Sequence, residues 1–188
     1  MSSNTFSNLP SAVDELIENW SHKALPPVDQ WHPKSSRTID ILIQKNGEWL
    51  YMGTPIHRPR LVQLFASVLR VDSDGSTWLV TPAEKLRIEV EDAHFQAVLL
   101  DVQDLHQQPA FVFTTNVGER VTADKAHLID VKYPNNDDTP APYLQVRSGL
   151  TARISRSVFI ELAHRAEIRG DVAGVVSCGV FMPLGPAQ

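Results

Sequence analysis

The stretch "GTPIHRPRLVQLF", residues 53–65, places a histidine and two arginines directly before an apolar run with helical spacing. Pro59 suits the first turn of a helix, because a backbone N–H at that position has no partner within the helix. The apolar residues that follow share one helix face: Leu61, Leu64, Phe65, Val68 and Leu69. The stretch therefore predicts an amphipathic helix over residues 59–70, with His57 and Arg58 at its start.

Strands are predicted on both sides of this helix. "IDILI" at 39–43 and "EWLYM" at 48–52 flank a turn at 45–47 whose Asn-Gly pair is typical of tight hairpins. After the helix, Asp72, Asp74 and Gly75 form a turn before the strand "TWLVT" at 77–81. The order hairpin, helix, strand follows from these three signals.

The middle of the chain reads as further strands. "KLRIEVED" at 85–92 alternates apolar and charged residues, and "FQAVLLDV" at 95–102 and "AFVFTTN" at 110–116 follow, separated by turn residues. This pattern predicts an antiparallel, curled sheet. "KYPNNDDTPAP" at 132–142 is polar and flanked by prolines, which predicts an exposed loop.

The last third repeats the earlier order, with a hairpin at 143–154, a helix at 157–169 and a strand at 175–181. At an offset of 98 residues, Ile56 and Arg58 align with Ile154 and Arg156, and the apolar positions of the two helices coincide. The expected fold class is α+β, with duplicated hairpin-helix-strand units and mainly antiparallel sheets.

Three regions are expected. Residues 1–35 hold a helix in "LPSAVDELIENW" followed by a proline-rich, extended connector. Residues 36–82 form an N-terminal α+β unit, and residues 83–188 form a C-terminal β-rich unit with one main helix.

Composition narrows the class of protein. Of 188 residues, 43% are hydrophobic and 21% charged, which is ordinary for a globular chain. The formal net charge of −5 opposes nonspecific nucleic-acid binding. No apolar run approaches the roughly 20 residues of a membrane helix, no secretory signal is visible, and Cys178 is alone. We expect no nucleic-acid partner, no membrane association and a cytoplasmic location.

The longer stretch "WLYMGTPIHRPRLVQLFASVLRVDSDGSTWLVTPAEKLRIEVED", residues 49–92, resembles the bacterial family known as domain of unknown function 1285. The likeness spans residues 31–182. The family pattern includes a Thr-Asn step, here Thr115-Asn116, and an Asp-Ala-Pro-Phe segment, which here reads "DAHF". His94 therefore departs from the pattern and is a poor choice for a shared catalytic base.

The resemblance implies a duplicated α+β core whose C-terminal half is superficially similar to a pleckstrin-homology fold. It implies no established activity. It also implies a nucleotide-like ligand held between the two domains and a role in signal transduction. A pleckstrin-homology likeness does not imply lipid binding, because function resides in sites rather than in folds.

Arg58 and Arg156 are the leading site residues, because both stand at the start of a predicted helix. Unpaired backbone N–H groups and the positive end of the helix dipole favour an anion there. A guanidinium adds a bidentate clamp for phosphate or carboxylate. In the alternative interpretation, each arginine pairs with an acidic side chain across the domain boundary, because a cation at a helix start opposes the dipole.

Four further residues are assigned to the same ligand. Lys85 adds positive charge, Glu84 and Asn116 offer hydrogen bonds to sugar or base edges, and His57 titrates near neutral pH beside a phosphate. Each also has a structural interpretation. Lys85 and Glu84 are then solvated turn residues, and His57 caps the helix start.

No motif supports catalysis or metal binding. The chain has no His-Glu-x-x-His pattern, no paired cysteines, no Gly-x-Ser-x-Gly elbow and no phosphate or dinucleotide glycine loop. We assign no catalytic residue, metal or cofactor. The expected function is a regulatory or sensor protein that binds a small anionic, nucleotide-like ligand. A protein-interaction module without a small ligand is the alternative, and an enzyme that uses His57 on a phosphorylated substrate has the least support.

Overall fold

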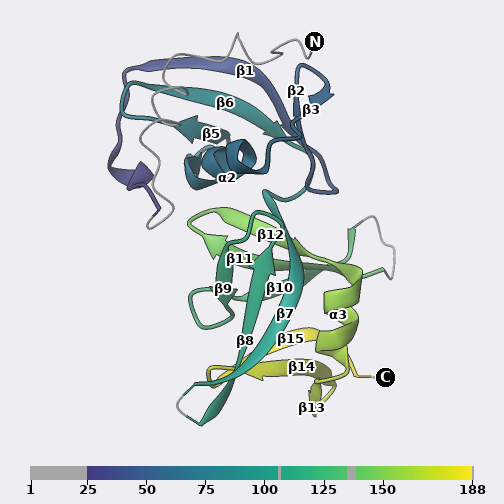
Figure 1. Ribbon diagram of the computed structural model, residues 1–188. Coiled ribbons are helices and arrows are strands. Elements are labelled where there is room, and N and C mark those ends of the chain that lie inside the picture. The colour runs from purple at the N-terminus through teal and green to yellow at the C-terminus, as the bar shows by residue number, and fades with distance from the viewer. Residues whose placement is uncertain (1–24, 106, 135–138, 188) are drawn as a thin grey trace. The chain divides into compact units, whose positions relative to one another are not determined.

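The computed structural model describes residues 25–105, 107–134 and 139–187 (Figure 1). The helix predicted within residues 9–20 lies outside these residues. The described residues fold as two compact units, one of residues 25–42 and 49–89, the other of residues 43–48 and 90–187. The first unit thus extends beyond residue 82, where the sequence placed its end.

The first unit is one six-stranded sheet with a helix against it (Figure 1). Its elements are η1 (a 3-10 turn, Val28–Gln30), β1 (Ser35–Ile43), β2 (Trp49–Tyr51), β3 (Thr54–Pro55), α2 (Pro59–Ser67), β4 (Leu69–Val71), β5 (Thr77–Val80) and β6 (Glu84–Val90). The strand order is β3-β2-β1-β6-β5-β4. β1 and β6 are parallel, because Arg37 pairs with Glu84 near one end and the Ile43 carbonyl accepts from the Glu91 N–H near the other.

The Asn-Gly hairpin and the helix after it form as the sequence predicts. The Gln44 N–H donates to the Glu48 carbonyl at 2.9 Å across the turn between β1 and β2. The indole of Trp49 on β2 is buried and stacks on Phe65 of α2, with ring centroids 6.0 Å apart. α2 stops at Ser67, short of the expected residue 70, because residues 69–71 pair as strand β4.

The second unit contains a six-stranded and a three-stranded sheet. Its elements are β7 (Phe95–Leu105), β8 (Gln108–Thr115), β9 (Arg120–Thr122), β10 (Ile129–Lys132), β11 (Ala141–Arg147), β12 (Leu150–Ile154), α3 (Arg156–Ala163), β13 (Glu167–Arg169), β14 (Val172–Ser177) and β15 (Val180–Pro186). The larger sheet has the order β10-β11-β12-β7-β8-β9, and residues 152–154 of β12 pair in parallel with residues 95–97 of β7.

A buried hydroxyl ties the two sheets of this unit together. Ser177 on β14 is fully buried, and its Oγ accepts from the Phe111 N–H of β8 at 2.9 Å. The same hydroxyl donates to the Ala123 carbonyl at 2.6 Å. The three-stranded sheet is thereby joined to the six-stranded one by paired polar groups as well as by apolar packing.

The predicted duplication is present in the order of elements. Three antiparallel strands, a helix and three more strands occur as β1–β3, α2, β4–β6 and again as β10–β12, α3, β13–β15. The pairing of these pieces differs. In the first unit the two groups of strands join through β1 and β6, whereas in the second unit β10–β12 joins β7–β9 and leaves β13–β15 as a separate sheet.

α3 is shorter than predicted. It ends at Ala163, whereas the expected helix ran to Arg169. Residues 167–169 are strand β13, which pairs with residues 172–174 through a turn at Gly170. Gly170 has a φ of 61°, a conformation that glycine adopts readily, so the turn diverts the chain into a hairpin. The extension of the helix to Arg169 was therefore wrong.

The turn at residues 43–48 is held inside the second unit by side-chain hydrogen bonds. Asn116 donates through Nδ2 to the Gly47 carbonyl at 3.1 Å and accepts at Oδ1 from the Gln96 N–H at 3.0 Å. Gln96 Nε2 donates to the Lys45 carbonyl at 2.9 Å. Gly47 is buried and has a φ of 85°. This close, left-handed backbone explains the glycine.

His94 is a buried, neutral histidine at the start of β7. Its side chain is 9% exposed, and its Nδ1 accepts from the Thr151 N–H at 3.2 Å. Burial, aided by the nearby positive charge of Arg147, lowers the pKa of His94 from 6.5 to about 4. Arg147 Nε lies 3.2 Å from Glu119 Oε1, and burial raises the pKa of Glu119.

We predict that stability falls in acid through His94. Its depressed pKa means that the unfolded chain takes up the proton first, so the free energy of unfolding drops as the pH falls from 6.5 toward 4, by about 3 kcal/mol in the limit. His94→Gln should remove this part of the pH dependence. Urea unfolding at about pH 7 and about pH 4.5 measures it, and Glu119 titrates in both proteins, so their difference reports His94. An unchanged pH profile in the variant would show that His94 is not the group responsible.

We also predict that Gly47→Ala is far costlier than Gly53→Ala. Both glycines have positive φ, but a Cβ at Gly47 would lie 2.7 Å from Gln96 Cγ and 2.8 Å from Asn116 Nδ2, whereas no atom lies within 4 Å of a Cβ at Gly53. We expect a loss of about 1 kcal/mol at Gly53 and about 2–4 kcal/mol at Gly47. Denaturant unfolding measures the stability of both variants. Equal losses of stability would contradict the close packing of Gln96 and Asn116 against the turn.

Candidate functional site

The start of α2 exposes a group of basic side chains. Ile56 is buried and its N–H donates to the Trp49 carbonyl at 2.8 Å, which fixes the chain just before the helix. Arg58 is the N-cap residue, with extended backbone at φ −106° and ψ 98°, and its side chain makes no capping bond. His57, Arg58 and Arg60 are all exposed, because the opposite face of α2 supplies the core.

The start of α3 is built differently. Ser155 is the N-cap, and its Oγ accepts from the Val158 N–H at 3.4 Å. Its own N–H donates to the Ala97 carbonyl of β7 at 3.0 Å, which fixes the helix start against the sheet. Arg156 is the first helical residue and is exposed. The two arginines that align in sequence thus occupy N-cap and first-turn positions.

The Arg156 side chain makes no hydrogen bond or ion pair with any residue that the structure describes. Its guanidinium is therefore not committed to an acidic side chain within those ranges. The guanidinium and the positive end of the α3 dipole both favour an anion.

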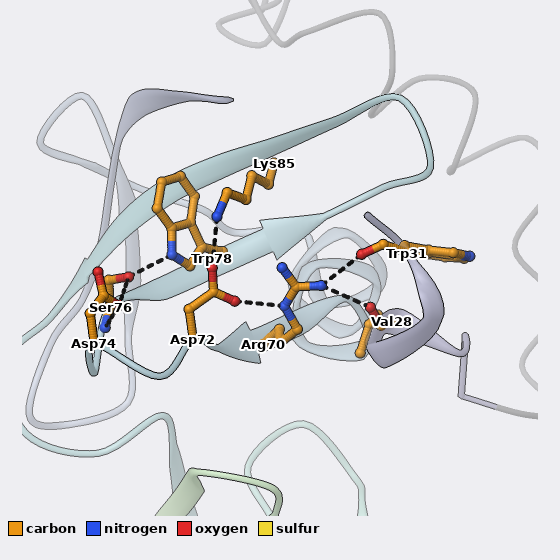
Figure 2. A network of polar contacts seen from close by, with 8 residues as sticks. All are labelled: Val28, Trp31, Arg70, Asp72, Asp74, Ser76, Trp78 and Lys85. Atoms are coloured by element: carbon orange, nitrogen blue, oxygen red, sulfur yellow. Dashed lines mark hydrogen bonds and ion pairs between the residues drawn. The ribbon is translucent and has the colours of Figure 1, made fainter. Parts of the chain in front are cut away.

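Lys85 lies in a polar network of the first unit, shown in Figure 2. Its Nζ is 2.7 Å from Asp72 Oδ2 and 4.1 Å from the centroid of the Trp78 ring. Arg70 Nε donates to the other carboxylate oxygen of Asp72 at 2.8 Å. Burial works to raise the pKa of Asp72, but the hydrogen bonds from Lys85 and Arg70 outweigh it and lower the pKa.

The same network fixes the N-terminal connector. Arg70 Nη1 donates to the carbonyls of Val28 at 3.1 Å and Trp31 at 2.8 Å, so one guanidinium joins β4 to the 3-10 turn (Figure 2). Trp78 Nε1 donates to Ser76 Oγ at 2.6 Å. Because Asp72 binds both Lys85 and Arg70, Lys85 is part of the network that holds the first unit together.

Glu84 and Asn116 also have internal partners. Glu84 Oε2 lies 3.0 Å from Arg37 Nε, and this pair joins β6 to β1. Asn116 bridges Gly47 and Gln96 in the turn described above. Of the predicted ligand residues, His57 and Arg58 lie together at the start of α2, Lys85 and Glu84 lie on β6, and Arg156 and Asn116 belong to the other unit.

A cluster of charged side chains around Tyr143, in the second unit, was not predicted from the sequence. Tyr143 Oη donates to Asp92 Oδ1 at 2.5 Å and accepts from Arg153 Nη1 at 2.8 Å. Lys132 Nζ and Arg153 Cζ each lie 5.0 Å from the Tyr143 ring centroid. Burial and the hydrogen bond to Asp92 raise the pKa of Tyr143. The cluster forms because β11 and β12 place Tyr143 opposite Arg153, a register that spacing alone does not reveal.

Two further observations concern only the described residues. No group of three or more His, Cys, Asp or Glu side chains in them is placed to hold a metal ion. No helix within the same ranges is long and apolar enough to cross a membrane.

We predict that Lys85 contributes to stability. Lys85→Ala removes the ion pair with Asp72 and the contact with the Trp78 ring, which together are worth about 1 kcal/mol. Lys34→Ala, at an exposed lysine, is the matched control and should change stability by less than about 0.5 kcal/mol. Urea unfolding followed by tryptophan fluorescence measures both. If the two substitutions change stability equally, Lys85 has no structural role and is again a candidate ligand residue.

Comparisons with known proteins agree with the sequence pattern. The chain matches the DUF1285 N-terminal domain over residues 26–93 and the DUF1285 C-terminal domain over residues 94–184, both described as of unknown function. No protein with a curated description matches it. The crystal structure of a DUF1285 family protein from Silicibacter pomeroyi DSS-3 is 36% identical, with a TM-score of 0.83, covering 93% of this chain and 94% of that one.

A DUF1285 family protein from Shewanella baltica OS155 is 25% identical, with a TM-score of 0.51, covering 66% of this chain and 90% of that one. The predicted family resemblance is confirmed. With both halves of the family pattern matched in order, the chain belongs to the DUF1285 family.

Proposed function

We propose that this protein is a cytoplasmic regulatory or sensor protein that binds a small anionic, nucleotide-like ligand through the arginines at its helix starts. The observation that carries the proposal is Arg156, exposed at the first position of a Ser-capped helix and without a partner among the described residues. The exposed basic side chains at the start of α2 provide positive charge at a second helix start.

The chemistry of these groups suits phosphate. Each helix start presents the positive end of a dipole, and the adjacent guanidinium adds a planar pair of donors that matches two phosphate oxygens. His57, next to Arg58, adds a ring N–H that can donate to a phosphate oxygen. The overall charge of −5 means that attraction for an anion depends on these local groups.

Arg58, Arg156 and His57 are the principal ligand residues of the proposal, because all three are exposed at the helix starts. No reaction is included, because the proposed contacts bind and orient an anion without supplying a nucleophile or a proton-transfer pair. In the proposed role in signal transduction, ligand binding changes the relative populations of the protein's conformers.

The test is a thermal-shift screen of the full chain against nucleotides, cyclic dinucleotides and inorganic phosphate. Ligand at about 100 times its dissociation constant adds roughly 2.7 kcal/mol of stability. We expect a hit that weakens in Arg58→Ala and in Arg156→Ala, with the melting temperature of the free variants little changed. Arg87→Ala, at an exposed arginine on β6, is the matched control and should keep the hit.

Three results would contradict the proposal. If affinity is unchanged in both helix-start variants, the ligand binds elsewhere. If the folded protein responds to no member of the panel, the arginines have another role, and the alternative of a protein-interaction module is favoured. Lowered melting temperatures in the free variants would identify the arginines as structural contacts.

A further inference from the structure

One edge of β7 is unpaired over most of its length among the described residues. β7 pairs with β8 along its length, but its pairing with β12 covers only residues 95–97. A β-bulge between Ala97 and Leu99 marks the point where β12 ends and the chain turns into α3. From residue 98 to residue 105, therefore, no described strand lies on the far side of β7.

The hydrogen bonds of β8 show which backbone groups point toward this open edge. The Phe111 N–H donates to Ser177 Oγ and its carbonyl accepts from Ala123, so both groups point away from β7. Its partner in the ladder, Val102, is consequently a non-hydrogen-bonded position, and the N–H and C=O of Val102 point to the open edge.

The same alternation applies on either side of Val102. Pro109, the partner of Asp104, has no N–H, and its carbonyl accepts from the Cys178 N–H on the side away from β7. Leu100 is two residues before Val102 and has the same orientation. The N–H and C=O groups of Leu100, Val102 and Asp104 make no hydrogen bond with a described residue beyond that edge.

Three exposed apolar side chains lie along the open edge, between the exposed polar residues Asp101, Gln103 and Asp104. Leu99 is 62% exposed, Val102 44% and Leu105 40%. The strand behind it is buried, because Phe111, Val112 and Phe113 of β8 are each no more than 5% exposed. An unpaired edge with exposed apolar side chains, on a firmly packed sheet, is a template for another strand.

We propose that a second copy of this chain covers it, by antiparallel pairing of the two β7 strands about a two-fold axis at Val102. In this register Val102 faces its own copy, Leu99 faces Leu105, and Leu100 faces Asp104. Outward-pointing residues oppose one another, so the N–H and C=O groups of Leu100, Val102 and Asp104 are satisfied. A two-fold axis makes this contact self-complementary.

Charge and strand length select this register over its neighbours. Pairing about Val102 places each Asp101 opposite Gln103, so no two carboxylates oppose each other. Pairing about Asp101 would set the two Asp101 side chains against each other, which destabilises a ladder. Pairing about Gln103 would leave Leu99 beyond the end of the partner strand.

The experiment is sedimentation equilibrium of the full chain over a concentration series, without any ligand. We expect the wild type to dimerise and Val102→Asp to raise the dimer dissociation constant by about tenfold or more, because two like charges meet at the axis. Val102→Lys should have the same effect. Mixing the two variants should restore the dimer through the Asp-Lys pair, which a merely misfolded protein would not do.

Ile168→Asp is the matched control, because Ile168 is 65% exposed on β13, the edge strand of the other sheet in the same unit. It should leave the dimer unchanged. A wild type that stays monomeric throughout the series overturns the proposal. A dimer that survives both Val102→Asp and Val102→Lys, or variants that fail to combine, overturns it as well.

Discussion

Each six-stranded sheet of this protein depends on one parallel pairing. A parallel pair cannot be made by a hairpin, so the intervening chain must cross back before the sheet can close. In the first unit that chain is β2 to β5 with α2, and in the second it is β8 to β11. The position of both helices follows, because α2 lies within the crossover and α3 begins where β12 leaves β7.

Local signals were sufficient for much of the fold. The Asn-Gly hairpin, the helix opened by Pro59 and the repeated order of elements are all confirmed, because each depends on residues close together in sequence. The predicted end of α3 was wrong, because residues 164–169 contain no strong signal that stops a helix. Residues 167–169 instead form a hairpin, which depends on pairing with β14. The likeness of the C-terminal half to a pleckstrin-homology fold stays a prediction.

In the candidate site too, features set by residues close in sequence could be predicted, whereas features set by distant strands could not. The exposed position of Arg58 and Arg156 follows from helix periodicity, which sequence displays directly. The partners of Lys85, Glu84 and Asn116 come from other strands and turns, so their internal bonds depend on sheet register. Sequence therefore indicated which side chains are charged or polar, but not which of them had already found a partner within the fold.

The late pairing of β12 with β7 has a consequence for biosynthesis. The first sheet has all its strands once residue 90 has left the ribosome, whereas residues 95–97 wait for residues 152–154. Ser177, which joins the last sheet to β8, is translated later still. During this interval β8 can already pair with β7, but the edge that β12 will cover is open on a nascent chain, a condition in which strands associate with the wrong partner. The second half is thus the part of the protein for which chaperone protection matters most.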